Sequence, residues 1–410
     1  MKKLMSVLLA LTMLLCTACG GKNTDSNADA PTTTEKGPVT SIYTDITGIP
    51  SETTVMTVGE IEISADLFFY WVNAIAADAE YIYQQYAMYY GQYGAFLNAD
   101  GSLNWDAAYT QNMTIGAVIR AQAMEKLAFF VITESFAKSH NITLSDEEIA
   151  AIETTIDENL EVYRQNLIKE DSANANLTAE EVEAKYFYTL GIDRADVVRL
   201  LAVTDLSKAI VEQMVTEGSA LYISDAAYND FAYYADHILI ATVDLETRRD
   251  LPADQIAEKK ALAEEILSVL QASDDMETLF ANLADLHSED TGRKDFPTGY
   301  IFTSGEMVAE FENAVKALQP GELSGLVKSD FGYHIILRRD IMEGLNAYPD
   351  EKAAMAEIYL TELINNIIAN STTTTKEALV GIDLSEVYNT YKERTTQSGT
   401  SQQGIETSDK

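Results

Sequence analysis

The chain has 410 residues and a formal net charge of −37, because 65 Asp and Glu outnumber 28 Lys and Arg. Phosphate binding needs clustered Lys and Arg, and no basic stripe interrupts the acids, so nucleic acid is excluded as a partner. The two cysteines, Cys16 and Cys19, both lie near the N-terminus. Disulfides, thiolate nucleophiles and Cys-ligated metals are therefore excluded from the folded part, whose stability must come from apolar cores.

The N-terminus has the features of an export signal. Lys2 and Lys3 precede an apolar run that ends at Leu15, which suits a secretory signal and is too short for a permanent membrane span. The residues before Cys19 resemble a bacterial lipobox, although Cys16 stands where that motif more often has Leu. The resemblance implies cleavage after Ala18 and a diacylglyceryl group on Cys19, whose two acyl chains anchor the protein to a lipid bilayer. The alternative is a plain signal peptide that leaves Cys19 free.

Composition and periodicity divide the chain into six parts. They are a signal peptide (1–18), a polar flexible tether (19–50), a helical N-terminal region (51–230), an α+β domain (231–340), a C-terminal helical segment (341–393) and a disordered tail (394–410).

The helical region carries recognisable N-terminal caps. Capping boxes pair Ser145 with Glu148 and Thr178 with Glu181, and Ser64 can cap the helix that follows it. The alternating stretch 56–64 predicts one short strand. Residues 81–96 contain six tyrosines. We expect these rings to pack a helix pair, and a client-binding surface is the alternative.

Residues 231–340 predict the order β-α-α-β-α-β-β. The helical spacing of 252–273, 276–288 and 304–318 alternates with short apolar runs typical of strands, at 236–243, 298–303, 323–330 and 331–340. The last run, "FGYHIILRRD", places His334 between apolar residues, where a strand normally buries something that costs less to desolvate.

The stretches "HILI" from His237, "SGEMVAEFENAVKALQPGELSGLV" and "FGYHIILRR" closely resemble the parvulin-type peptidyl-prolyl cis/trans isomerase domain. With the lipobox and the helical flanks, the whole arrangement resembles the PrsA-type foldase lipoproteins, with SurA as a more distant relative. The resemblance implies an α+β fold in which a parvulin domain is inserted in a mainly helical, SurA-like chaperone lobe. The C-terminal segment would then pack back on the N-terminal helices.

The resemblance also implies a site. His237 and His334 fall where parvulins place two histidines on neighbouring strands, and we expect the rings to share a hydrogen bond that keeps at least one of them neutral. Asp290 falls near the reacting carbonyl. Because isomerisation breaks no covalent bond, the resemblance implies no cofactor and no metal.

By position, three apolar residues would line a pocket for the proline ring: Met307, Phe311 and Phe331. Met307 and Phe311 are four residues apart, which places them on one face of the expected helix. The turn "FPTGY" departs from the glycine-rich turn that parvulins carry, so that Gly299 or Tyr300 takes the rim position of the substrate pocket. Arg248 and Arg249 lie in an acidic loop, and we interpret them as solvated rather than phosphate-binding.

The sequence thus predicts an isomerase that acts on Xaa-Pro bonds of unfolded exported polypeptides and holds these clients at the outer face of a bacterial cell membrane. A holdase with a weak or inactive parvulin fold is the alternative. A lipoprotein that captures solutes or metals through His287 is disfavoured, because His287 has no His or Cys partner at ligand spacing. No Ser-His-Asp arrangement suggests a hydrolase. The oligomeric state stays open, a homodimer included.

Overall fold

The computed structural model describes residues 41–397, so the predicted signal peptide and Cys19 lie outside the described residues. The described chain forms two compact units. We call residues 41–209 with 362–397 the helical unit, and Ile210–Thr361 the sheet unit. The chain leaves the helical unit once and returns to it once, which makes the sheet unit an insertion. Its boundaries lie inside two helices, so that it is longer than the α+β domain predicted at 231–340.

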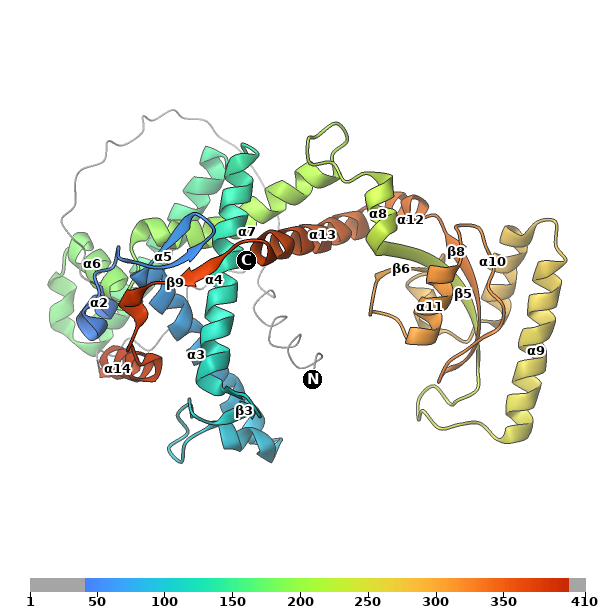
Figure 1. Cartoon of the computed structure of the whole chain (residues 1–410), viewed down its shortest axis with the longest axis horizontal. Helices are drawn as coiled ribbons and strands as arrows, with labels where there is room; N and C mark the ends of the chain where they lie inside the picture. The colour runs from blue at the N-terminus through green and yellow to red at the C-terminus, as the bar shows by residue number, and fades with distance from the viewer. Residues whose placement is uncertain (1–40, 398–410) are drawn as a thin grey trace. The chain divides into compact units, whose positions relative to one another are not determined.

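The helical unit is built mainly from long helices, coloured blue to green and dark red in Figure 1. Its helices, counting two that continue into the sheet unit, are α2 (Ile42–Thr47), α3 (Ala65–Ala87), α4 (Ile115–Ser139), α5 (Asp146–Glu170), α6 (Ala179–Leu190), α7 (Arg194–Val215), α13 (Pro349–Ala369) and α14 (Leu384–Gln397). Its strands and short 3-10 helices are β1 (Thr54–Val58), β2 (Ile61–Ser64), η1 (Gly91–Phe96), β3 (Ala108–Thr110), β4 (Met113–Thr114), η2 (Ser172–Asn176), β9 (Thr373–Thr375) and η4 (Glu377–Leu379).

The predicted strand 56–64 is two strands. β1 and β2 pair as an antiparallel hairpin, and Gly59 between them has a φ of 59°, a conformation that glycine adopts without steric cost. β9 pairs with the other edge of β1, opposite Met56 and Thr57. The C-terminal part of the chain therefore completes a sheet that the N-terminal part begins.

A buried carboxylate joins α14 to α3. Glu80 is 5% exposed, accepts a hydrogen bond from Leu103 N at 3.1 Å, and contacts Lys392 Nζ and Tyr388 Oη of α14. A buried charge is tolerated when such partners satisfy it. The prediction that the tail is disordered from residue 394 is wrong for its first residues, because α14 continues to Gln397.

The predicted tether also ends earlier than expected. Ser41 caps α2, and the α2 side chains Ile42 and Tyr43 are each 2% exposed. Their burial attaches this short helix to the helical unit, although the polar composition around them favours a flexible chain.

Both predicted capping boxes are confirmed, with Ser145 and Glu148 beginning α5 and Thr178 and Glu181 beginning α6. Ser64 occupies the N-cap of α3, but its side chain makes no capping hydrogen bond. No helix among residues 41–397 is both long enough and apolar enough to cross a bilayer.

The sheet unit confirms the predicted order β-α-α-β-α-β-β. Its elements are α8 (Asp225–Phe231), β5 (Ala232–Ala241), α9 (Ala253–Gln271), α10 (Met276–His287), η3 (Thr291–Lys294), β6 (Tyr300–Thr303), α11 (Ala309–Ala317), β7 (Val327–Lys328), β8 (Gly332–Arg339) and α12 (Ile341–Ala347). The four strands form an antiparallel sheet in the order β6-β5-β8-β7.

The two faces of this sheet bury different sets of side chains. Alternate residues of β5 and β8, such as Ile238 and Ile335, pack against α9 and α10. The other face, with Ala235 and Ile336, packs against Phe311 of α11. Figure 1 shows α9 and α10 on one side of the sheet and α11 on the other. Because side chains alternate along a strand, the β5–β8 register decides which residues meet below α11.

The tyrosine-rich segment does not pack as predicted. Of its rings, Tyr83 is 3% exposed, whereas Tyr81, Tyr89 and Tyr90 are 64%, 78% and 57% exposed. The end of α3 packs against the short 3-10 helix η1, through Tyr83 and Tyr86, and not against a second long helix.

Gly332, at the start of β8, allows a test of the register between β5 and β8. A Cβ on Gly332 would stand 2.2 Å from Ile240 O, and its φ of 155° is one that other residues rarely adopt. We expect Gly332→Ala to lower the unfolding free energy of the sheet unit by about 1–3 kcal/mol, measured by hydrogen exchange of the β5 and β8 amides. Gly325→Ala is the control, because its Cβ meets no atom within 4 Å. Equal protection in the two variants would contradict the expectation.

Candidate active site

The two histidines of the sheet unit lie on the face that packs against α11. Leu239 pairs with His334 across the β5–β8 ladder, and His237 is two residues from Leu239, so the histidines are diagonal neighbours on one face. Their ring centroids are 5.3 Å apart, with the ring planes at 79°. The expectation that His237 and His334 lie on neighbouring strands with their rings close together is therefore confirmed.

The predicted hydrogen bond between the two rings is wrong. Both ring nitrogens of His237 and Nδ1 of His334 are buried without a hydrogen-bond partner. The reason is geometric, since a diagonal pair with nearly perpendicular rings directs one imidazole edge at the face of the other.

His334 instead hydrogen-bonds to a serine that the sequence analysis missed. Its Nε2 lies 2.7 Å from Ser329 Oγ, and both residues are 4% exposed. The same Oγ accepts a hydrogen bond from Phe331 N at 3.1 Å. Ser329 lies in the tight β7–β8 connection, and a polar residue there, five positions before His334, was the signal available in the sequence.

Asp290 lies beside His237. Its Oδ2 is 3.5 Å from His237 Nε2 and accepts a hydrogen bond from Tyr300 Oη at 2.5 Å, while its Oδ1 accepts one from Gly292 N. The Tyr300 ring also stacks on His237, with centroids 5.9 Å apart. The structure thus gathers the three predicted catalytic residues, and it gives Tyr300 a second role as a donor to Asp290.

Both imidazoles are neutral at physiological pH. Burial lowers the pKa of His237 to about 4; the Asp290 carboxylate opposes this shift and the Arg293 guanidinium adds to it. Burial, together with a smaller effect of the neighbouring His237, lowers the pKa of His334 to about 3. Burial also raises the pKa of Tyr300 well above its usual value, as does its hydrogen bond to Asp290, so its hydroxyl stays protonated and donates.

An ion pair supports the strand that carries His237. Asp236 is 4% exposed, accepts a hydrogen bond from His237 N, and binds Arg293 Nη1 at 2.8 Å. Arg293 also binds Asp285 of α10. The pair links β5 to η3, the segment that follows Asp290, and so fixes Asp290 relative to His237.

Phe311 forms the apolar wall above the histidines. Its ring lies 5.1 Å from that of His237 and 5.7 Å from that of His334, centroid to centroid, and the residue is 3% exposed. The prediction that Met307 shares a helix face with Phe311 is wrong, because α11 begins only at Ala309. Met307 precedes the helix but still packs against the Phe311 cluster.

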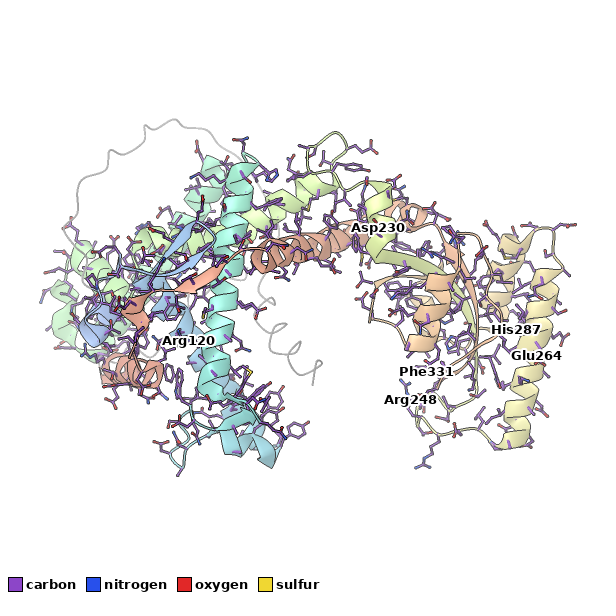
Figure 2. All side chains as sticks on the ribbon, in the orientation of Figure 1. Arg120, Asp230, Arg248, Glu264, His287 and Phe331 are labelled. Carbon is purple, nitrogen blue, oxygen red and sulfur yellow. The ribbon has the colours of Figure 1, made fainter. Side chains whose placement is uncertain are left out.

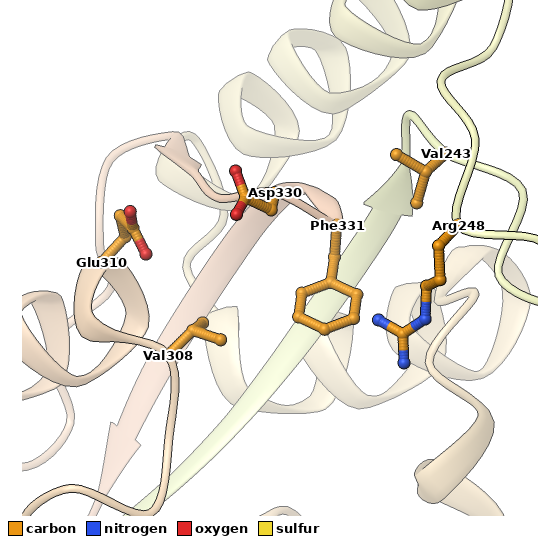
Figure 3. A pocket seen from close by; sticks show the side chains of 6 residues that line it. All are labelled: Val243, Arg248, Val308, Glu310, Asp330 and Phe331. Carbon is orange, nitrogen blue, oxygen red and sulfur yellow. The ribbon is translucent and has the colours of Figure 1, made fainter. Parts of the chain in front are cut away.

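A hollow of about 360 Å³ opens next to Phe331. Its lining residues are Val243, Arg248, Val308, Glu310, Asp330 and Phe331. Figure 3 shows the Phe331 ring between Val308 and Arg248. Of the three predicted pocket residues, only Phe331 lines this hollow. Phe311 is buried in the apolar cluster next to the histidines, and Met307 directly precedes the lining residue Val308.

Arg248 is exposed, as the sequence predicts, and it also contacts an aromatic ring. Its guanidinium carbon lies 4.6 Å from the centre of the Phe331 ring, and Figure 2 shows the two residues together at one end of the sheet unit. Its φ of 57° is unusual for a residue with a side chain. Asp244 stabilises this loop, since its side chain accepts hydrogen bonds from Glu246 N and Thr247 N.

The departure at "FPTGY" has a backbone reason. Gly299 has a φ of 110°, and a Cβ there would stand 2.5 Å from Ala235 O. Gly299 therefore allows β6 to approach β5. Tyr300, which follows it, donates a hydrogen bond to Asp290 and is not among the residues that line the hollow next to Phe331. His287 ends α10, and no group of His, Cys, Asp or Glu within residues 41–397 is arranged to hold a metal ion.

Comparison with known proteins identifies this region. Residues 237–340 match the family model described as "Rotamase: PPIC-type PPIASE domain". This segment is a parvulin-type peptidyl-prolyl isomerase domain. The parvulin domain includes every predicted site residue of the sheet unit, from His237 to His334.

Parts of the chain are also similar to curated proteins. The chain is 53% identical over 66 residues to "Foldase protein PrsA 1" of Bacillus cereus, and 38% identical over 116 residues to "Foldase protein PrsA" of Staphylococcus aureus. These matches cover 16% and 28% of this chain, and 23% and 34% of the relatives' lengths. The chain thus matches about a quarter to a third of the length of each relative.

Solved structures include a peptidylprolyl isomerase (PrsA) from Bacillus cereus, 21% identical, with 70% of this chain and 97% of that one covered and a TM-score of 0.26. The parvulin of Nitrosopumilus maritimus is 32% identical, with 27% and 96% covered and a TM-score of 0.19.

The buried histidines predict an acid-sensitive parvulin domain. The unfolded chain binds protons near pH 6.5, whereas folded His237 and His334 do so only near pH 4 and 3. Their contribution to stability is therefore complete above about pH 6.5 and is lost as the pH falls toward 4. We expect a slope of about 1.4 kcal/mol per pH unit for each histidine, measured by hydrogen exchange of β5 and β8 amides.

His334→Phe should reduce this slope by about half, since one of the two titrating groups is removed. The exposed His140→Gln is the control and should leave the slope unchanged. An unaltered slope in His334→Phe would mean that buried His334 does not contribute.

Proposed function

We propose that the protein catalyses cis/trans isomerisation of Xaa-Pro bonds in exported polypeptides. The observation that carries the proposal is the neutral pair His237 and His334, covered by Phe311. The same unit has a hollow that Val243, Val308 and Phe331 line together with the charged Arg248, Glu310 and Asp330. The match of residues 237–340 to the isomerase family model supports it.

The reaction requires little chemistry from the protein. Rotation about a peptide C–N bond has a barrier of about 18–20 kcal/mol, because it destroys the amide resonance. The protein must hold the proline ring and favour the twisted amide over both planar forms. It needs neither a nucleophile nor a change in the covalent bonds of the substrate.

The site residues divide this task. Phe331, with Met307 and Phe311 beside it, offers the apolar surface for the proline ring. The Tyr300–Asp290 pair places polar groups near the ring, where the carbonyl of the twisted amide becomes more ketone-like. His237 and His334 act as positioning residues, since neutral rings fill the space under the pocket without adding a charge.

We further propose that the helical unit holds unfolded clients while the parvulin domain acts on their prolines. The sheet unit is inserted in the helical unit, so a client held by one unit is tethered close to the other and meets it at a high effective concentration. The names of the relatives, foldase proteins, agree with this division of roles.

We also propose that the protein is held at the outer face of the bacterial cell membrane by a diacylglyceryl group on Cys19. The support is in the sequence: Lys2 and Lys3, the apolar run to Leu15, and Cys19 after Thr17 and Ala18.

A second candidate function is a holdase with a weak parvulin site. Arg248 favours it, because its guanidinium covers the Phe331 ring and a prolyl ring would have to displace it. Activity then decides between the two candidates.

A protease-coupled Xaa-Pro peptide assay on the full chain tests the isomerase. We expect clear acceleration over the uncatalysed rate, and a decrease of about tenfold or more in kcat/KM for Phe331→Ala and Met307→Ala through loss of apolar contact. Leu286→Ala, an exposed change on α10, is the control. A parent rate equal to the uncatalysed rate would favour the holdase.

Anchoring is tested separately with Cys19→Ala in the host cell. We expect mass spectrometry of the N-terminal peptide to find a diacylglyceryl group on Cys19 in the parent. The variant should lose this group and leave the membrane fraction, because the acyl chains supply the affinity for the bilayer. An unmodified parent Cys19 would show a plain signal peptide instead.

A further inference from the structure

The end of α3 carries an exposed aromatic surface that the parvulin domain does not use. Four large side chains within ten residues are more than half exposed, namely Tyr81, Met88, Tyr89 and Tyr90, and Tyr86 is 40% exposed. The rings of Tyr86 and Tyr90 are in contact, with centroids 6.0 Å apart. Single exposed apolar residues are common, but several large ones within ten residues favour an interaction site. We call these five residues the tyrosine surface.

The tyrosine surface has a rigid aromatic base. The Tyr93 ring contacts those of Tyr83, Tyr86 and Tyr90, with centroids 5.5 to 6.4 Å apart. Tyr83 is buried and also contacts Phe96, at 5.0 Å. Because these contacts fix the base, a ligand need not order it on binding, and less conformational entropy is lost.

The following loop is tied to the same end of α3. Gln84 donates a hydrogen bond to Gly101 O, and Leu103 N donates one to Glu80. These bonds hold Asp100 beside the tyrosine surface. Two hydrogen bonds from Ser102 lower the pKa of Asp100, so its exposed carboxylate is ionised at neutral pH.

The charge around the tyrosine surface is mainly negative. Residues 81–119 contain no Lys or Arg, and their acidic residues are Asp100 and Asp106. The next basic residue in the sequence is Arg120 on α4, labelled in Figure 2. Lys392 of α14 also lies near Asp100, and it is bound to Glu80. Tyrosine ring faces are themselves negative and attract Arg and Lys side chains. Rings and carboxylates together therefore favour a cationic ligand.

The same charges disfavour two other ligands of the tyrosine surface, an anionic lipid surface and a second copy of this chain. An anionic lipid surface attracts basic residues, and Lys392, which lies near Asp100, is already bound to Glu80. A second copy would bring an identical acidic surface, which is repulsive. An extended polypeptide with basic side chains suits this surface better. Its side chains can contact separate rings, while its backbone carbonyls accept hydrogen bonds from the tyrosine hydroxyls.

We infer that the tyrosine surface, with Asp100 at its edge, binds extended polypeptide segments that carry Arg or Lys. The inference rests on the client-holding part of the proposed function and gives its site and its ligand class. Basic stretches of an unfolded client bind here, while the prolines of the same client reach the parvulin domain.

The test measures binding of labelled peptides to the full chain in mild detergent by fluorescence anisotropy. The probe is a short proline-free peptide of Arg, Leu, Ser and Gly, so that the parvulin site contributes little. Matched peptides replace Arg by Gln or by Glu. We expect the Arg peptide to bind about tenfold more tightly than the Glu peptide, with a difference that decreases at high salt.

The variant Tyr81→Ser/Tyr89→Ser/Tyr90→Ser should weaken binding of the Arg peptide by about tenfold, because three ring faces are lost. These side chains are exposed, so the variant should fold. Val162→Ser/Val380→Ser removes exposed apolar groups elsewhere in the helical unit and should leave binding unchanged. Equal affinity of parent and tyrosine variant, or equal affinity for the Arg and Glu peptides, overturns the inference.

Two further measurements separate this inference from the proposed function. Sedimentation of parent and tyrosine variant detects a dimer: a parent dimer that the variant loses would make the surface a self-interface and overturn the inference. Suppression of aggregation of an unfolded client tests holding itself. A parent that holds no client ends the holding proposal, whereas a parent and a variant that hold equally well end only the role of the tyrosine surface.

Discussion

The register between β5 and β8 is the constraint on which the candidate site depends. It places His237 and His334 as diagonal neighbours on the face below α11, and burial there lowers the pKa of both rings far enough that they are neutral at physiological pH. A slip of one residue would move a histidine to the opposite face of the sheet. The register thus determines both the position and the charge of the pair.

The surrounding groups hold the pair without charging it. Ser329 binds His334 from the β7–β8 connection, and the Tyr300–Asp290 hydrogen bond lies beside His237. Asp236, which pairs with Arg293, directly precedes His237 on β5, so its side chain lies on the opposite face of the sheet from the histidines. Neutral rings suit a reaction that only twists an amide, because a buried charge would bind water or ions in place of a prolyl ring.

The helical unit is formed from two parts of the chain that are separated by the sheet unit. Its C-terminal strand and helix complete the structure that its N-terminal residues begin, through β1–β9 pairing and the contact of Glu80 with Lys392. Such closure allows a whole domain to be inserted between the two halves. It also leaves the end of α3 free to present tyrosines to solvent on a rigid aromatic base.

The sequence by itself determined the strand and helix order of residues 231–340 and both capping boxes, since periodicity and local motifs encode these. The approach of His237, Asp290 and His334 was predicted only from the resemblance to parvulins. It could not give the start of α11 after Met307, the contact of Ser329 with His334, or the stacking of Arg248 on Phe331. Nor could it decide whether Tyr81 and Tyr89 are buried. These features depend on which surfaces meet in three dimensions, and a side chain's burial is set by neighbours that are distant in the chain.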